Sequence, residues 1–472
     1  AHLISPSHPL PRASPALPPL QAFRRLCVAR DKSDEEKRLE QEMDKGQIEQ
    51  MKQLSAGGLG AAPSEREDDP EILRQLAYRL CQDDACLVIA EVVSHAKTDN
   101  FFLPAAQVLL EMSKTPEARG KMVQQGGFKA LLTLTVCHDE KARVAAAWGL
   151  AKVGISINPT LYPRRTGSGP EAMVVPLVKL IDDGEGELQQ FEAAMTLCNL
   201  ATVPELKERI VGAKAWRALE MALTSSNTLV QRASIECMSN LVSSEEIADK
   251  FTSPTSTATK IFVGFSGSDD VRTQIAATGG IATLAGVPEI GEALVDAKVL
   301  DPLVEIALIG DDPGLVHRAA VSLQRLMESA LEKVVGPSGG PVPDHAMLAL
   351  GALSSLASTS TVAPAKKAAM DAIEELGRAR PDIRLPPPEL VAEAVKKMQQ
   401  EHDAKVAAAE EEEREAEEEA EQAKADEEAA KAARIDKAQA RKEKLANIKE
   451  GDEPLIEEDD DDDDDEDGLE VI

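Results

Sequence analysis

An apolar helical pattern returns about every 42 residues between positions 70 and 330, and this repetition restricts the possible folds most strongly. Blocks such as AAMTLCNLA (193–201) and IECMSNLVS (235–243) carry apolar residues at helical spacing, and a shorter apolar helix pattern precedes each block. Equivalent positions lie 40, 50, 41, 43 and 42 residues apart, at Leu109, Gly149, Asn199, Asn240, Thr283 and Arg325. Three-helix units of this length are typical of armadillo and HEAT arrays, whose repeats stack to bury one continuous core. The sequence therefore predicts an all-α, armadillo/HEAT-like superhelical solenoid.

Composition and charge exclude several classes of protein. Only 3% of the residues are aromatic and 43% are hydrophobic, mostly Ala, Leu and Val, which favours helices over strands. The formal net charge of −31 argues against a basic surface that binds nucleic acid. No run of about 18 uncharged apolar residues occurs, so no membrane-spanning helix is predicted. We therefore expect neither nucleic acid nor a membrane as a partner.

The two ends of the chain differ in composition from the repeats. Residues 389–472 carry 33 acidic and 12 basic residues, and eleven consecutive acids run from Glu457 to Asp467. Residues 1–30 hold six prolines, four arginines and no acid. The low acid content is typical of an organelle transit peptide, but the prolines would break its helix, so a disordered leader or a gene-model extension is the preferred interpretation.

The chain is accordingly divided into five segments. The repeat domain occupies 70–330 and degenerate terminal helices occupy 331–380, where they form the last part of the array. The other segments are a disordered leader with a short charged helix and a linker at 1–69, a proline hinge with a charged helix at 381–450, and a disordered acidic tail at 451–472.

The repeat spacing has one exception, the step of 50 residues. It contains GISINPTLYPRRTGSGPE (154–171), whose prolines and glycines are incompatible with a helix. We expect this segment to project from the solenoid as a loop, and long loops in compact arrays are usually functional or disordered.

No catalytic or cofactor-binding signature is present. The chain lacks a phosphate-binding loop, a GxSxG turn and an HExxH helix, and its seven histidines are isolated. The six cysteines are scattered without a zinc spacing, which favours free thiols in a reducing, cytoplasmic environment. The sequence therefore predicts a non-enzymatic protein without a metal or a cofactor.

Two asparagines indicate a binding surface. Asn199 and Asn240 occupy equivalent positions in adjacent repeats, on helices expected to line one concave groove. Each amide offers a donor and an acceptor, so a ladder of amides could bind the backbone of an extended peptide. Replacing both residues by Ala is then expected to weaken client binding with little loss of stability. The same helix faces carry Glu192, Met195, Thr196, Arg232 and Glu236.

The surroundings of these asparagines resemble the UCS (Unc/Cro/She) domain of myosin chaperones. That family has a similar NP-containing loop, followed by a FEALMALTNLA-like helix and an RRAATECMCNLV-like helix in this order. The resemblance is strong from about 105 to 250 and weaker to 330. The segments that carry it are GISINPTLYP (154–163), VVPLVKLI (174–181), QQFEAAMTLCNLATV (189–203) and VQRASIECMSNLVSSEE (230–246).

The resemblance implies a right-handed armadillo superhelix that binds the myosin heavy chain motor domain and assists its folding with the ninety-kilodalton heat-shock chaperone. It assigns Glu192, Asn199, Arg232 and Asn240 to the client groove. The family's conserved loop would contain Asn158, Pro159, Tyr162 and Pro163. The loop here ends in YPRRTG instead of the family's aromatic-Pro-Gly-Gln-Arg pattern, and residues 1–70 lack the tetratricopeptide period with which animal members dock the heat-shock partner.

The favoured interpretation is a chaperone or co-chaperone that holds a segment of the myosin motor domain in the solenoid groove. The alternative is a generic armadillo scaffold or adaptor for another protein. A further alternative takes the acidic tail as the active part, in a histone- or ribosome-binding module.

Overall fold

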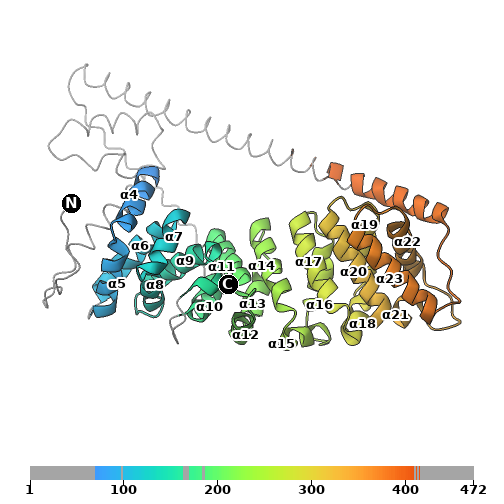
Figure 1. The fold of residues 1–472 in the computed structure, drawn as a ribbon, viewed down its shortest axis with the longest axis horizontal. Coiled ribbons are helices and arrows are strands. Elements are labelled where there is room, and N and C mark those ends of the chain that lie inside the picture. Colours follow the sequence, from blue (N-terminus) through green and yellow to red (C-terminus); the bar gives the residue numbers. More distant parts are fainter. Residues whose placement is uncertain are drawn as a thin grey trace, which may run out of the picture. The chain divides into compact units, whose positions relative to one another are not determined.

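The computed structural model describes residues 70–96, 99–162, 169–182 and 186–404, together with 406–408, 411 and 414. This part of the chain is built of α-helices and short 3-10 helices and contains no strand. Figure 1 shows the helices following one another in sequence order, from α4 to α23. The prediction of an all-α array is confirmed.

The described helices form successive units of a short first helix, a second helix and a third helix. The first helices are α4 (Pro70–Gln82), α7 (Pro116–Gln124), α12 (Pro204–Gly212), α15 (Glu245–Ala248, followed by η5, Asp249–Phe251), α18 (Pro288–Asp296) and α21 (Leu331–Val335). The second helices are α5 (Ala85–His95), α8 (Gly127–Leu134), α10 (Val174–Asp182), α13 (Ala215–Ala222), α16 (Ala258–Ser266), α19 (Leu300–Ile309) and α22 (Asp344–Thr359). The third helices are α6 (Phe102–Ser113, preceded by η2, Asp99–Phe101), α9 (Glu140–Ser156), α11 (Glu187–Leu200), α14 (Thr228–Leu241), α17 (Val271–Leu284), α20 (Pro313–Ser329) and α23 (Ala363–Ala379).

Each third helix packs against the third helices of the units before and after it, from α6 through to α23. Small side chains make this close approach feasible, because Ala146, Ala193 and Ala233 are fully buried on consecutive third helices. The buried apolar residues of all units form one continuous cluster. This arrangement explains the low aromatic content, since stacked Ala- and Leu-rich helices leave little space for large rings.

Caps and turns recur with the repeat. The residue before a third helix accepts a hydrogen bond from a backbone amide of the first turn at Asp139, Asn227, Asp270 and Asp312. The turn between the first and second helices contains a residue with positive φ at Gly126, Lys214 and Lys298. These turns coincide with the breaks QQGG, VGAK and VDAK in the sequence, so the breaks set where second helices begin.

The third unit has no α-helical first element. In its place lie two 3-10 turns, η3 (Pro159–Leu161) and η4 (Pro170–Met173), each beginning with a proline whose fixed φ suits a helix start. This is the segment that the sequence predicts as a projecting loop. Its described ends pack against the solenoid instead, because Tyr162 and Pro170 are buried. Residues 163–168 lie outside the described part.

The array continues past residue 330. Helices α21, α22 and α23 pack in the same order as the earlier units, and α23 lies against α20. The chain is then held by Arg380, which is 5% exposed and donates to the carbonyl oxygen of Gly336 at 2.7 Å. Helical structure resumes from 388 to 404, where Val391 lies against Gly351 of α22.

The chain ends extend beyond the described residues. The described residues from His402 onward belong to a second structural unit and are helical. The remainder of the predicted charged helix, the acidic tail at 451–472 and the leader at 1–69 lie outside the described residues. The division into five segments stays a prediction.

Candidate functional site

The partly exposed side of the third helices is the surface on which the sequence predicts a client groove. On α11 it carries Glu192, Met195 and Asn199, which share a helix face because they are three or four residues apart. One residue in the middle of this side is partly exposed on each of five consecutive third helices, from α9 to α20. We call this surface the third-helix face, and its central positions are Ala145, Met195, Glu236, Gly279 and Val321.

The two asparagines lie at the edge of this face, and their amides are bonded within the protein. The Nδ2 atom of Asn199 donates to the carbonyl oxygens of Gly154 at 2.8 Å and Ile157 at 3.1 Å, at the C-terminal end of α9. The Nδ2 atom of Asn240 lies 3.3 Å from the carbonyl oxygen and 3.2 Å from Sγ of Cys198 on α11. An amide nitrogen has two hydrogens, so these bonds occupy the donors that the sequence assigned to a peptide. Both asparagines instead join one repeat to the preceding one.

Thr196 lies beneath the third-helix face. It is fully buried, and its hydroxyl donates to the carbonyl oxygen of Ala151 at 2.7 Å. The sequence placed it among the client-binding residues because it neighbours Met195, but consecutive positions point to different sides of a helix. Met195 itself is partly exposed and packs at the edge of the core. Like Thr196, Arg325 on α20 bonds to the preceding repeat, because its side chain donates to the carbonyl oxygen of Ala282 on α17.

Glu192 is the centre of a cluster that joins α9 and α11. Its carboxylate accepts from Nε1 of Trp148 at 2.5 Å and from Nζ of Lys152 at 2.8 Å to each oxygen. The Lys152 and Glu192 side chains are 8% and 13% exposed, so the ion pair is largely shielded from water. The Lys152 ammonium also lies 4.8 Å from the centroid of a Trp148 ring, within reach of a cation–π interaction.

Sequence reasoning missed Trp148 and Lys152. Their partner lies 44 and 40 residues away along the chain, so no local motif contains the cluster. The repeat register could have indicated this cluster, because it places α9 directly beside α11.

Arg232 forms a second connection between repeats. Its Nε and Nη2 atoms donate to the two carboxylate oxygens of Asp270, with Nε 3.0 Å from Oδ2. Asp270 also caps α17 by accepting from the backbone amide of Thr273 at 2.8 Å. The hydrogen bonds from Arg232, together with those from Thr273, lower the pKa of Asp270 to about 2.

Glu236 lies one turn after Arg232 at the centre of the third-helix face. Burial raises the pKa of its carboxyl, while Arg232 and Arg272 act in the opposite direction. Among the described residues, no side chain or amide donates a hydrogen bond to Glu236. Its carboxylate is therefore available as an acceptor for a ligand.

The residues of the predicted client-binding loop have different environments. Asn158 is exposed, but its Oδ1 atom accepts from the backbone amide and hydroxyl of Thr160 and caps η3. Pro159 is buried. Tyr162 is 3% exposed, and its ring centroid lies 4.6 Å from that of Phe128. These contacts make Tyr162 an anchor of the segment, so the prediction that it faces a client does not agree with its burial. Pro163 lies outside the described residues.

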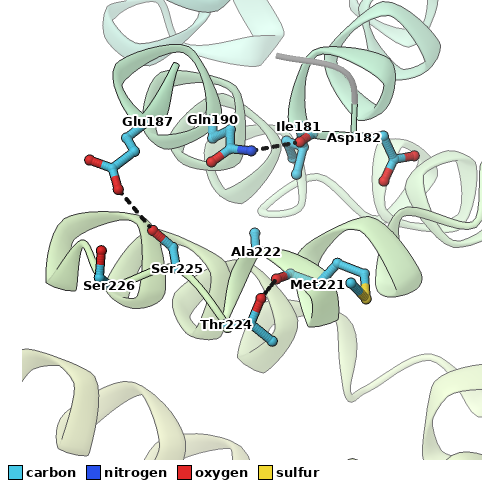
Figure 2. Close-up of a pocket in the computed structure, with 9 residues that line it drawn as sticks. All are labelled: Ile181, Asp182, Glu187, Gln190, Met221, Ala222, Thr224, Ser225 and Ser226. Atoms are coloured by element: carbon cyan, nitrogen blue, oxygen red, sulfur yellow. Dashed lines mark hydrogen bonds between the residues drawn. The ribbon is translucent and has the colours of Figure 1, made fainter. Parts of the chain in front are cut away.

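A separate depression of about 500 Å³ lies between the third and fourth units, where α10 and α11 of the third unit meet α13 and the turn that follows it. Figure 2 shows Glu187 facing Ser225 and Gln190 facing Ile181 in this pocket, where the carboxylate accepts from the Ser225 hydroxyl at 3.3 Å and Gln190 donates to the Ile181 carbonyl at 3.1 Å. The arrangement holds the turns in place. The pocket is lined by Ile181, Asp182, Glu187, Gln190, Met221, Ala222, Thr224, Ser225 and Ser226.

The described residues show neither a metal cluster nor a membrane-spanning helix. They contain no group of three or more His, Cys, Asp or Glu side chains arranged to hold a metal ion. None of their helices has the length and apolar character needed to cross a membrane.

Comparison with known proteins identifies relatives of the solenoid. No protein-family model matches the chain. Protein unc-45 homolog B of Mus musculus is 30% identical over 277 residues, which cover 57% of this chain and 29% of that protein. The chain thus spans less than a third of the length of this curated relative.

Solved structures show the same fold. UNC-45 from Drosophila melanogaster superposes with a TM-score of 0.63 at 24% identity, over 76% of this chain and 44% of that one. The resemblance to the UCS family is confirmed over the solenoid. The solenoid also matches the structure of the myosin chaperone UNC-45 from C. elegans in complex with an Hsp90 peptide. That superposition has a TM-score of 0.57 at 19% identity and covers 68% of this chain and 34% of that one. The prediction of an armadillo-like solenoid is therefore confirmed.

Proposed function

We propose that this protein is a non-enzymatic chaperone or co-chaperone that binds a segment of the myosin heavy chain motor domain along its third-helix face. The observation that carries the proposal is the similarity of the solenoid, in sequence and in fold, to UNC-45 proteins. One of these is described as a myosin chaperone. Stacked repeats use such extended surfaces to bind polypeptide segments, which agrees with this role.

The third-helix face offers suitable chemistry for a polypeptide client. Met195 supplies a partly exposed, adaptable apolar contact, and Glu236 supplies an acceptor that is not used within the described structure. The pairs Lys152–Glu192 and Arg232–Asp270 fix the helices on which these groups stand. A client would therefore meet a rigid surface, which lowers the entropy lost on binding.

The proposal is tested by measuring the binding of a purified myosin motor domain to the full chain. We expect saturable binding that Met195→Glu weakens, because the substitution places a charge at the centre of the third-helix face. Met221→Glu is the matched control, since Met221 is 60% exposed but lies on the second helix α13. Equal loss with both variants would contradict binding on this face.

Co-purification from a cell extract separates this function from that of a general scaffold. Myosin heavy chain should be enriched with the full chain and lost with Met195→Glu. Enrichment of another protein in the absence of myosin would overturn the proposal.

The heat-shock partner and the location are part of the same proposal. The solved C. elegans UNC-45 with an Hsp90 peptide motivates a test of whether the ninety-kilodalton chaperone co-precipitates with this chain. A cytoplasmic location is supported by the described cysteines, none of which forms a disulfide bond, as in proteins of reducing compartments. Cell fractionation would test it, and recovery in an oxidising compartment would contradict it.

A further inference from the structure

Three consecutive third helices present three different chemical groups at the third-helix face. Helix α11 presents the apolar Met195, and α14 presents the carboxylate of Glu236. Helix α17 presents Gly279, which has no side chain of its own, and Arg318 from α20 lies over it. An added Cβ at Gly279 would be 3.4 Å from Nε of Arg318. Along the solenoid the order is therefore apolar, negative and positive.

The two charged groups of this series have no partner of opposite charge in a hydrogen bond or ion pair among the described residues. Arg318 donates through Nη1 to the carbonyl oxygen of Gly314 at 2.9 Å, and no described carboxylate pairs with it. Glu236 receives no hydrogen bond, although Arg232, Arg272 and Asp270 contribute to its electrostatic surroundings. The nearest cation on its own helix, Arg232, is already bonded to Asp270. A ligand can thus complement both charges without breaking an existing pair.

The spacing of the three groups limits the ligand. Packed helices are about 8–10 Å apart, and α11, α14 and α17 pack in series. A polypeptide in the extended polyproline II conformation advances about 3.1 Å per residue with three residues per turn, so side chains three residues apart point to the same side about 9 Å apart and match neighbouring helices.

We propose that the third-helix face of α11, α14 and α17 binds an extended client segment that carries an apolar, a basic and an acidic side chain at successive intervals of about three residues. The apolar side chain contacts Met195, the basic side chain pairs with Glu236, and the acidic side chain pairs with Arg318. The three side chains can follow one another in either direction along the client chain. This inference rests on the proposed client-binding function and specifies the chemistry of the segment that is bound.

A random 12-residue peptide library displayed on phage, selected on the full chain, tests the order of groups without assuming a client. We expect enrichment of peptides with a Lys or Arg about three residues from an apolar residue and an Asp or Glu about three residues beyond it. Selection on Glu236→Lys should exchange the basic residue for an acidic one, and Glu236→Gln should remove the preference at that position. Peptides selected on the wild type should bind Glu236→Lys at least about tenfold more weakly, the loss expected for one charge-assisted hydrogen bond.

The matched control is Glu289→Lys, which makes the same change of charge on the first helix α18. Its selected peptides should match those of the wild type. Circular dichroism and thermal unfolding of each variant establish that it is folded. If Glu236→Lys does not fold, the isosteric Glu236→Gln alone tests the preference at this position. A library without this pattern, or a pattern unchanged by both Glu236 variants, would overturn the inference.

Binding of the myosin motor domain, measured in parallel, separates the inference from the proposed function. If the motor domain binds but the pattern is absent, the inference alone fails. If the pattern is present but the motor domain does not bind, the proposed function fails and the peptide chemistry of the face stands.

Discussion

The side-chain nitrogen of Asn199 lies 2.8 Å from the carbonyl oxygen of Gly154, 45 residues earlier and one repeat away. This bond satisfies a carbonyl in the last turn of α9, where helices leave acceptors without intrahelical partners. Asn240 makes the corresponding connection to Cys198. The two asparagines therefore stabilise the stacking of repeats, in addition to any contact that their oxygens make with a client.

Asn199→Ala should lower the free energy of unfolding by about 1–3 kcal/mol, because it leaves two carbonyl oxygens near the end of α9 without their donor. This expectation opposes the one drawn from the sequence, in which stability changes little. Urea denaturation measures the difference. Thr283→Ala, at the equivalent position on α17, is the control, because its hydroxyl bonds within its own helix and its loss should cost less than about 0.5 kcal/mol. Equal stability of Asn199→Ala and wild type would refute the structural role.

Glu192→Ala should be among the most destabilising substitutions on the third-helix face, costing about 3–5 kcal/mol, because it leaves the shielded Lys152 ammonium without its partner. The double variant Lys152→Met with Glu192→Leu should lose less, since it removes both charges. Urea denaturation compares the two. Trp148 should also change its fluorescence emission in Glu192→Ala, because its indole N–H loses an acceptor. A double variant less stable than the single one would contradict this account.

Asp270→Asn should reveal a stability contribution that depends on pH. The folded-state pKa of Asp270 is lowered to about 2, below an unfolded value of about 3.9, so the ionised form is stabilised by folding. The contribution is complete above about pH 4 and is lost as the pH falls towards 2. We expect the wild type to exceed Asp270→Asn by about 1–2 kcal/mol at neutral pH, a value reduced because the side chain is 25% exposed.

Urea denaturation of both proteins between pH 2 and pH 7 checks this dependence. Asn retains the capping role, so the comparison isolates the charge. A difference that stays constant across the range would show that the pair with Arg232 contributes nothing through ionisation.

The adjacent glycines of α17 should respond in opposite directions to substitution by Ala. At Gly279 the added methyl group meets Arg318 only at ordinary contact distance, so removing a flexible helical glycine should stabilise the protein by up to about 1 kcal/mol. At Gly280 the methyl group would overlap the buried ring of Phe262, and a loss of about 1–3 kcal/mol is expected. Each variant is the control for the other in urea denaturation. Equal effects would contradict the packing described for α17.

Tyr162→Phe should leave client binding unchanged and should not destabilise the protein. The hydroxyl of Tyr162 is buried without a hydrogen-bond partner among the described residues, so its removal is expected to be neutral or to stabilise by about 1 kcal/mol. Tyr162→Ala should instead cost about 3 kcal/mol or more, because it leaves a cavity beside Phe128. Thermal unfolding and motor-domain binding check both variants. Weaker client binding by a stable Tyr162→Phe variant would show that the Tyr162 hydroxyl contacts the client.

The repeat register could be predicted because each unit obeys the same local rules. Helical periodicity and the breaks before second helices place Asn199 and Asn240 on equivalent positions of neighbouring helices. The segment after α9 is different. Its prolines exclude an α-helix but do not reveal that two 3-10 turns replace a first helix and that Tyr162 anchors them in the core.

The candidate site was predicted less completely because its bonds connect different repeats. The helix face of Asn199 follows from the sequence, but the direction of its amide depends on how far α11 rotates relative to α9. The pair of Lys152 with Glu192 depends on the same rotation, and the burial of Thr196 depends on the closeness of the two helices. Local spacing contains no information on these quantities.

The replacement of a first helix by η3 and η4 has a mechanical consequence. Repeats joined only to their neighbours carry tension in series, so an applied pull extends the most compliant joint first. The other described units place three helices across each joint, whereas the third unit has two α-helices and a pair of short turns. Side-chain bonds between α9 and α11, among them those of Asn199 to the carbonyl oxygens of Gly154 and Ile157, therefore carry part of the load across this joint that a first helix carries elsewhere.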